Sequence, residues 1–470
     1  MAVTTISRAG LYGGAGYSGS DTVAKTSAYT VVAGDDQKTI LCSAASADYA
    51  VALTAAATLG DGFTVTLKKS DATKFMITIN PSGTQTIDGL LDLKLRNEHS
   101  EATLICDGSN WHLISHENVA IEYNVVENAG CEVDQYSHIT RTGLGGSSLY
   151  LIDRWKIISN GTASARWTFS QESAGGTDGK SKWLKMLCTT PDASPSAAEG
   201  NYLQQKFMGN SGQIFLGTDG LFENATYSMD IIGHLNTPDA PYTAVIGLTC
   251  LNGTQRVFLE EVPIAADAAF ERIYFTIPED ATADIDPGTS VSFYVSVSLY
   301  GGSNVQASTG WTGAGGNETA TSGGQNWASA ANNYIGFTKP KLQPGQIATP
   351  FIPRLYAQEL DICQFYFEKV VVAATYFATG LATTTTNGAP IVTYKTKRAA
   401  PTFLTNDVTD FNVVYAGGGT ATTGLVFAGG NSTNSGRLNA ALGSAVLTAD
   451  DAILMKGVSS GTFISFNSEI

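Results

Sequence analysis

The sequence predicts an all-β, multidomain protein, and three observations support this prediction. Glycine accounts for 50 of the 470 residues, which is above the usual share of ~7 %. Charged residues make up only 15 %, against a typical ~25 %, whereas coiled coils and helical bundles are rich in Glu, Lys and Leu. Apolar and polar residues alternate along many short segments, which is typical of strands with one buried face. The length is sufficient for about three domains.

The N-terminal quarter is expected to contain an anchor and a small domain. Residues 1–26 are rich in Gly, Ser and Thr and have too few apolar groups for a core, so we expect an extended anchor that a partner holds. In residues 27–118, Phe63, Val65 and Leu67 alternate with polar residues. Asp-Gly pairs separate such runs and indicate turns. This pattern predicts a small all-β domain, and the resemblance described below implies a role for it in attachment.

Residues 119–352 are expected to form a jelly-roll β-sandwich. The clearest strand covers 291–300, where the apolar face alternates with Ser and Tyr. Similar runs around Trp167, Met186 and Phe275 indicate many strands in one unit, which fits a two-sheet sandwich. Residues 301–333 are rich in Gly, Ser, Thr and Ala. A loop of this length within a compact domain is usually functional or mobile.

A connector and a final β domain are expected to complete the chain. Leu360, Cys363 and Phe367 recur at helical spacing after Pro353, so residues 353–370 predict a helical connector with the helix itself over 354–370. Residues 371–470 return to short apolar runs separated by Gly pairs, which predicts a C-terminal β tip domain.

The charge balance and the cysteines restrict the possible partners. Lys and Arg total 27 and Asp and Glu total 42, giving a net charge of −15, which argues against a phosphate-binding groove for nucleic acid. The long uncharged stretches are too polar for membrane insertion, and the first residues do not resemble a secretory signal. We therefore expect synthesis in the cytoplasm. The six cysteines lack zinc-site spacing, and we expect reduced, mostly buried thiols.

Several motifs match catalytic patterns but lack the required context. Gly14, Gly16 and Gly19 match GxGxxG without the flanking strand and helix of a dinucleotide site. The GxSxG match at Ser459 has no histidine after it in the chain, unlike the corresponding hydrolases. His112 and His116 share a strand face, but a pair of strand-end side chains explains them better than a metal site does. We expect no enzymatic activity and no cofactor.

Two further clusters could bind ligands. Glu279, Asp280, Asp284 and Asp286 form an acidic turn that could ligate a structural Ca²⁺, although a solvated turn is the simpler interpretation. Aromatic side chains in and around residues 301–333 could stack on sugar rings or anchor the loop by packing. These candidate glycan-binding residues are Trp311, Trp327, Tyr300 and Tyr334.

Three stretches resemble bacteriophage fibre and tail-fibre-like virion proteins. The N-terminal stretch contains GDGFTVTLKKS, TIDG and ICDGSNWHLIS, the middle contains LIDRWKI and later KLQPGQIATPFIPRLYAQELDICQFYFEK, and the C-terminal part contains KRAAPTF. The middle segment is the most specific. Its matching positions include Arg154, Glu359, Cys363 and Tyr366, whereas Phe365 stands where that segment more often carries a basic residue.

The resemblance implies a homotrimeric virion fibre that attaches by its N-terminus to a phage tail, neck or capsid protein. It further implies that the distal domains bind host surface polysaccharide. Two alternatives are a polysaccharide-depolymerising tailspike and a capsid decoration fibre without a receptor role. The aromatic-rich helix favours a trimer interface because large exposed apolar patches mark interfaces. The expected interface residues are Tyr356, Leu360, Phe365, Tyr366 and Phe367.

Overall fold

The computed structural model describes residues 22–71, 75–89, 92–95, 99–117, 124–137, 140–217, 220–236, 241–313, 318–346 and 348–469. These residues form mainly strands, so the predicted all-β class is confirmed. The chain divides into two compact units. Unit 1 is Met1–Tyr123, Gly217–Ala225 and Pro344–Thr349, and unit 2 is Asn124–Leu216, Thr226–Gln343 and Pro350–Ile470. Residues 1–21 of the predicted anchor lie outside the described residues.

Unit 1 contains two small sheets that share one apolar core. The five-stranded sheet has the order β1 (Thr22–Lys25), β3 (Lys38–Cys42), β5 (Thr64–Lys69), β8 (Glu101–Cys106) and β9 (Trp111–Glu117). The four-stranded sheet has the order β2 (Tyr29–Val31), β4 (Tyr49–Leu53), β6 (Ile77–Asn80) and β7 (Leu93–Leu95), and α1 covers Ala56–Leu59. Successive strands from β1 to β6 alternate between the sheets, so neighbours within a sheet pair in parallel. Trp111 is fully buried in the core.

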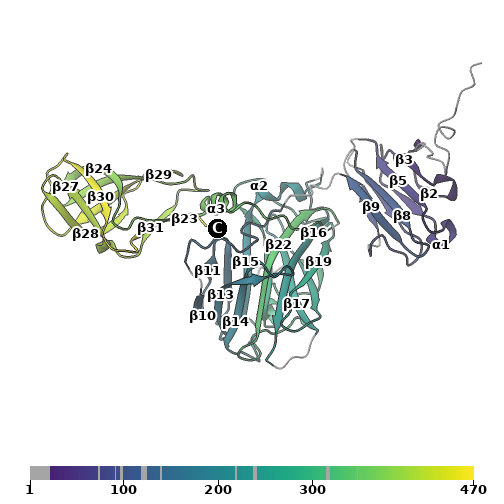
Figure 1. The fold of residues 1–470 in the computed structure, drawn as a ribbon, viewed down its shortest axis with the longest axis horizontal. Coiled ribbons are helices and arrows are strands. Elements are labelled where there is room, and N and C mark those ends of the chain that lie inside the picture. The colour runs from purple at the N-terminus through teal and green to yellow at the C-terminus, as the bar shows by residue number, and fades with distance from the viewer. Residues whose placement is uncertain are drawn as a thin grey trace, which may run out of the picture. The chain divides into compact units, whose positions relative to one another are not determined.

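The first part of unit 2 is a sandwich of two sheets, drawn in teal and green in Figure 1. The six-stranded sheet has the order β10 (Thr140–Leu144), β13 (Arg166–Gly175), β14 (Ser181–Thr190), β22 (Tyr334–Pro344), β16 (Ala225–His234) and β19 (Glu271–Ile277). The seven-stranded sheet has the order β11 (Leu149–Ile152), β12 (Trp155–Asn160), β15 (Gly200–Met208), β20 (Val291–Gly301), β17 (Tyr242–Cys250), β18 (Arg256–Ile264) and β21 (Gly310–Gly313). The short helix α2 covers Gly209–Gly212. Trp155 and Phe337 pack between the sheets with ring centroids 4.8 Å apart.

The connector helix is shorter than the sequence predicts. The helix α3 covers Tyr356–Gln364, and the strand β23 follows at Phe367–Val371, so the prediction of a helix over 354–370 is wrong at its C-terminal end. Strand β23 pairs with β31 (Phe463–Asn467), which also pairs with β26 (Thr402–Thr405). The valines at 370–372 favour a strand because β-branched side chains fit a pleated sheet.

The last part of the chain is a closed barrel, drawn in yellow-green in Figure 1. Its strand order is β24 (Tyr376–Thr384), β25 (Asn387–Thr393), β29 (Ser435–Leu442), β28 (Gly418–Phe427), β27 (Phe411–Tyr415) and β30 (Ala452–Gly457). Every neighbouring pair is antiparallel, and β30 pairs with β24 to close the circle. Phe411, Leu438 and Met455 are buried inside.

Candidate functional site

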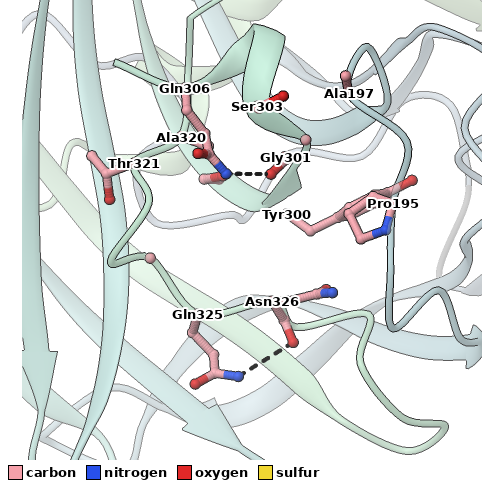
Figure 2. Close-up of a pocket in the computed structure, with 13 residues that line it drawn as sticks. Pro195, Ala197, Tyr300, Gly301, Ser303, Gln306, Ala320, Thr321, Gln325 and Asn326 are labelled. Atoms are coloured by element: carbon pink, nitrogen blue, oxygen red, sulfur yellow. Dashed lines mark hydrogen bonds between the residues drawn. The ribbon is translucent and has the colours of Figure 1, made fainter. Parts of the chain in front are cut away.

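A cavity of about 370 Å³ lies on the seven-stranded sheet of the sandwich. We call it the sandwich cavity. Its lining comes from residues within 195–197, 298–306 and 320–326, and Figure 2 shows ten of them labelled. Ligand sites commonly enclose ~300–1,000 Å³, so this cavity can hold one or two small rings.

Strand β20 supplies the floor because its polar side chains face away from the sandwich interior. The Cβ of a residue at Gly247 would meet Ser296 Oγ at 2.6 Å and Leu259 at 2.9 Å, so these positions share one face. Ser298 lies two residues along the same strand and lines the cavity. Residues on this face are buried even though they are polar, since Ser296 and Ser298 are only 1 % and 4 % exposed. The sequence pattern alone does not predict this burial.

The roof is the segment 301–333, which is largely held in place where the structure describes it. Ala307 packs on Val245, Val257 and Leu259 and makes a small second core on the outer face of the sheet. The backbone NH groups of Ala307 and Trp327 donate to the carbonyls of Ala320 and Leu299, at 2.9 and 3.0 Å. The segment also contains β21, which pairs with β18 at the sheet edge. The predicted long loop is therefore an ordered cover, apart from residues 314–317, which lie outside the described residues.

One glycine fixes the wall of the cavity. The backbone NH of Gly302 donates to Glu199 O, and that of Asn304 donates to Ala197 O, both at 2.8 Å. A Cβ at Gly302 would lie 2.0 Å from Ser196 O and 2.7 Å from Ala197 O. Only glycine allows the two backbone segments to come this close.

The polar lining is uncharged and has its amide nitrogens engaged within the chain. Gln306 Nε2 donates to Gly301 O at 2.8 Å and Gln325 Nε2 donates to Asn326 O at 3.3 Å, as the dashed lines in Figure 2 show. Asn326 Nδ2 donates to Asp192 O at 2.9 Å, and Asn326 Oδ1 accepts from Ala328 N at 2.8 Å. The side-chain oxygens of Ser298, Ser303, Gln306 and Gln325 have no partner among the described residues. The cavity therefore offers hydroxyls and hydrogen-bond acceptors.

The four aromatic residues predicted to bind glycans lie at different places in the sandwich. Trp327 is fully buried and packs edge-on against Tyr242 at 5.8 Å, so its ring has no free face for a sugar. Tyr300 lines the cavity but is only 2 % exposed, and its ring contacts Trp167 at 6.5 Å. Trp311 packs on Phe258 at the sheet edge.

Tyr334 belongs to the other sheet of the sandwich. Its ring lies 5.1 Å from that of His234, and Lys185 Nζ lies 4.3 Å from its centroid. The four aromatics therefore do not converge on one site. Of the four, Tyr300 alone lines the sandwich cavity, and the other polar lining residues Ser298, Gln306 and Gln325 carry no distinctive spacing in the sequence.

The aromatic residues predicted for a trimer interface divide into exposed and buried ones. Tyr356 is 55 % exposed, and Leu360 and Phe365 are half-buried. Tyr366 and Phe367 are only 1 % and 5 % exposed. Since partners within the same chain cover these two side chains, their assignment to an interface between copies is wrong.

Tyr366 belongs to a buried charged group that we call the Arg154 cluster, formed by Arg154, Glu127, Glu469 and Tyr366. Arg154 Nε lies 2.6 Å from Glu127 Oε2, its Nη1 donates to Glu469, and its Nη2 donates to Lys206 O at 2.5 Å. Its guanidinium carbon lies 3.5 Å from the Tyr366 ring centroid, a cation–π contact. Burial raises the pKa of Glu127 and outweighs the opposing effect of Arg154. The cluster ties the end of the chain to the sandwich.

Asp153 lies beside this cluster and is also fully buried. Its carboxylate accepts two hydrogen bonds from Gln135, one from the backbone N and one from Nε2, both at 2.6 Å. Burial raises the pKa of Asp153 to about 8. Gln135 Nε2 also donates to Phe367 O at 2.8 Å, so this contact fixes the start of β23.

The other predicted clusters are engaged within the chain. Asp280 pairs with Arg256 at 2.5 Å and accepts from Thr282 and Ala283. Both ring nitrogens of His112 contact carboxylates, Asp88 at 3.1 Å and Asp107 at 2.9 Å. Among the described residues, no group of three or more His, Cys, Asp or Glu could hold a metal ion. All six cysteines are free and buried, as predicted.

The remaining features concern a membrane span and the hydrolase-like motif. Within the described part of the chain, no helix is long and apolar enough to cross a membrane. Ser459 of the GxSxG match donates to Asp410 Oδ1 at 3.0 Å in an exposed turn. The GxGxxG match at Gly14, Gly16 and Gly19 lies outside the described residues.

Comparison with known proteins finds solved structures of low similarity. No protein-family model and no curated protein matches the chain. Among solved structures, the Clostridium thermocellum xylanase 10B fragment complexed with xylohexaose is 12 % identical, with a TM-score of 0.23, and the match covers 50 % of this chain and 30 % of that one. The module TmCBM61, complexed with β-1,4-galactotriose, is 11 % identical over 47 % of this chain and 98 % of its own, with a TM-score of 0.21.

A phage protein is also among the structural neighbours. The enzymatically active domain of bacteriophage CBA120 tailspike protein 4 is 11 % identical over 69 % of this chain and 35 % of that one, with a TM-score of 0.24. The neighbours thus include carbohydrate-binding modules and a phage tailspike domain. With identities and TM-scores this low, no conclusion rests on these similarities.

Proposed function

We propose that the chain is a structural fibre protein of a bacteriophage virion that binds host surface glycans and has no enzymatic activity. The observation that carries glycan binding is the sandwich cavity, with its uncharged lining, ordered roof and side-chain oxygens without partners. The resemblance of the LIDRWKI and KLQPGQIATPFIPRLY segments to phage fibres supports the virion role. The glycan-binding part is thus assigned to the sandwich and the attachment part to the N-terminal segment.

The distribution of exposed apolar residues supports self-association, and the resemblance to phage fibres supports a homotrimer as its form. Eleven of the fifteen exposed large apolar side chains among the described residues lie after residue 350. Exposed apolar side chains that gather on one surface mark interaction sites. We therefore assign the C-terminal part to self-association rather than to receptor binding at the tip of the fibre.

The outer face of the barrel offers a defined contact for this assembly. Ile391 of β25 and Leu454 of β30 both pair with Thr379 of β24, so they lie in one row across three strands. Leu381 is two residues further along β24, on the same face. The three apolar side chains are 55 %, 41 % and 52 % exposed, respectively. We call them the barrel patch.

The assembly is tested by native mass spectrometry of the full chain at micromolar concentration. We expect a trimer for the natural sequence and a monomer for the double variant Ile391→Lys, Leu454→Lys, since a charge in a buried apolar contact is costly. The control is Ile114→Lys in unit 1, a position that is 56 % exposed and outside the barrel patch. A monomeric natural protein would refute the assembly proposal.

The glycan-binding role is tested by incubating the full chain with capsule and lipopolysaccharide from the host. We expect binding without release of new reducing ends. Release of reducing ends would instead identify a depolymerase, which needs two placed carboxylates. Immunogold electron microscopy of intact particles tests the virion role separately, and absence of label from particles would refute it.

A further inference from the structure

The lining of the sandwich cavity also restricts the chemical class of its ligand, and this inference rests on the proposed glycan-binding role. Among the described residues that line the cavity, none carries a charge. The amide nitrogens of Gln306, Gln325 and Asn326 already donate within the chain. The carbonyl oxygens of Gln306 and Gln325 remain available as acceptors.

The floor adds a hydroxyl that is accessible from the cavity. Ser298 is 4 % exposed, lines the cavity, and its Oγ has no hydrogen-bond partner in the described part of the chain. A buried hydroxyl without a partner is unfavourable unless a ligand or water completes its hydrogen bonds. A hydroxyl can both donate and accept, so Ser298 matches another hydroxyl on a ligand.

Negative charge lies directly behind the cavity wall. The carboxylate of Glu199 accepts from the backbone NH of Ser196 at 2.9 Å, between the lining residues Pro195 and Ala197. This hydrogen bond lowers the pKa of Glu199, so the group stays ionised. Burial raises the pKa of Tyr300 above its usual range, and Asp192 and Glu199 add to this effect. Arg166, which acts in the opposite direction, already donates to the carbonyls of Ala163 and Ala165.

We infer that the sandwich cavity binds an uncharged saccharide whose hydroxyl groups donate to Gln306 Oε1 and Gln325 Oε1 and exchange a hydrogen bond with Ser298. A carboxylate, sulfate or phosphate on the sugar accepts hydrogen bonds only, and the lining offers it no cation. The carboxylates behind the wall repel it further. Acidic capsular sugars are therefore excluded from this cavity.

The test uses the full chain on a glycan array that carries neutral hexose and deoxyhexose oligosaccharides, uronate- and sialate-bearing oligosaccharides, and free amino sugars. We expect the neutral compounds to bind with dissociation constants of ~1 mM per site. Ser298→Ala should weaken neutral binding between about twofold and tenfold, the usual range for one hydrogen bond. Ser308→Ala is the matched control, because Ser308 is an exposed serine of the same segment outside the lining.

A second variant keeps the inference testable if Ser298→Ala fails to fold. Ser303 is exposed at the rim, and Ser303→Lys should shift the preference at least threefold towards uronate-bearing compounds. Strongest binding of acidic or amino sugars by the natural protein would overturn the inference while glycan binding stands. Neutral binding that neither variant alters would place the site elsewhere. Absence of binding to every glycan would refute the proposed function itself.

Discussion

The sandwich cavity and the Arg154 cluster are both polar and both lie in unit 2, yet they differ in whether their buried polar groups find partners within the chain. In the cluster, Arg154 is 1 % exposed and contacts two carboxylates, a carbonyl and a tyrosine ring. In the cavity, Ser298 Oγ and Gln306 Oε1 have no hydrogen-bond partner within the described part of the chain. All three guanidinium nitrogens of Arg154 have partners within the chain, which indicates a structural role, whereas the polar groups that line the cavity remain available to a ligand.

The largest expected effect follows from removing the cation of the Arg154 cluster. Arg154→Met leaves Glu127 and Glu469 buried without a counter-charge, which costs about 3–5 kcal/mol of unfolding free energy. Urea unfolding followed by tryptophan fluorescence measures this, since five of the six tryptophans lie in unit 2.

The matched control is a surface ion pair of the same unit. Lys395 and Asp361 are 2.8 Å apart, with side chains 57 % and 64 % exposed. Lys395→Met should cost less than about 1 kcal/mol. Equal losses for the two variants would contradict a structural role for the Arg154 cluster.

The second prediction concerns pH. Because burial raises the pKa of Asp153 to about 8, the folded state keeps a proton that the unfolded state loses near its ordinary pKa of ~3.9. The folded state thus binds more protons in the window from about pH 4 to about pH 8. The stabilisation that protonated Asp153 contributes is fully present below this window. It is lost as the pH rises through the window, by at most about 1.4 kcal/mol of unfolding free energy per pH unit.

Asp153→Asn separates this effect from other titrating groups. The nearby carboxylates of Glu469 and Asp134 also favour the protonated form of Asp153, and they remain in the variant. Urea unfolding at pH 4, 6 and 8 should show a smaller decline for Asp153→Asn than for the natural protein. An identical pH slope in both proteins would rule out Asp153 as its source.

The sequence predicted parts of the Arg154 cluster but not the sandwich cavity, for physical reasons. Period-two alternation identified β13, β14, β19 and β20 because one face of each strand packs in the sandwich. The LIDRWKI segment pointed to Arg154 through a family resemblance, but its partner Glu469 lies 315 residues away and no local pattern links them. The cavity depends on a roof that buries the polar face of β20. A period-two pattern gives no information about what covers the polar face, so it does not indicate that Ser298 lines a cavity.

The third prediction returns to the cavity wall. Gly302→Ala places a methyl group within 2.0 Å of Ser196 O, so the wall must shift and unfolding free energy should fall by about 1–3 kcal/mol. Glycan binding should weaken as well, because Ala197 and Gly302 both line the cavity. Gly424→Ala is the control, since a Cβ there meets only Ala441 at 3.6 Å. A stable Gly302→Ala variant with natural glycan affinity would refute the role of this wall.

The smallest expected effect tests whether an aromatic residue or the polar lining recognises the sugar. Trp311 lies on the edge strand β21, outside the lining, with its indole Nε1 donating to Pro278 O at 2.7 Å. Its ring packs edge-on against Phe258 at 5.6 Å. Trp311→Phe keeps an aromatic ring at this position and should change the dissociation constant for a neutral oligosaccharide by less than twofold. Trp311→Ala should also change this dissociation constant by less than twofold while lowering stability, because the packing on Phe258 is lost.

A sugar stacked on the Trp311 indole would instead lose about 1 kcal/mol or more of binding free energy in Trp311→Ala, on the scale of one aromatic contact. Isothermal titration of both variants beside Ser298→Ala decides between the two modes of recognition: the serine variant should weaken binding more than either tryptophan variant, and the reverse order would place the sugar at the sheet edge.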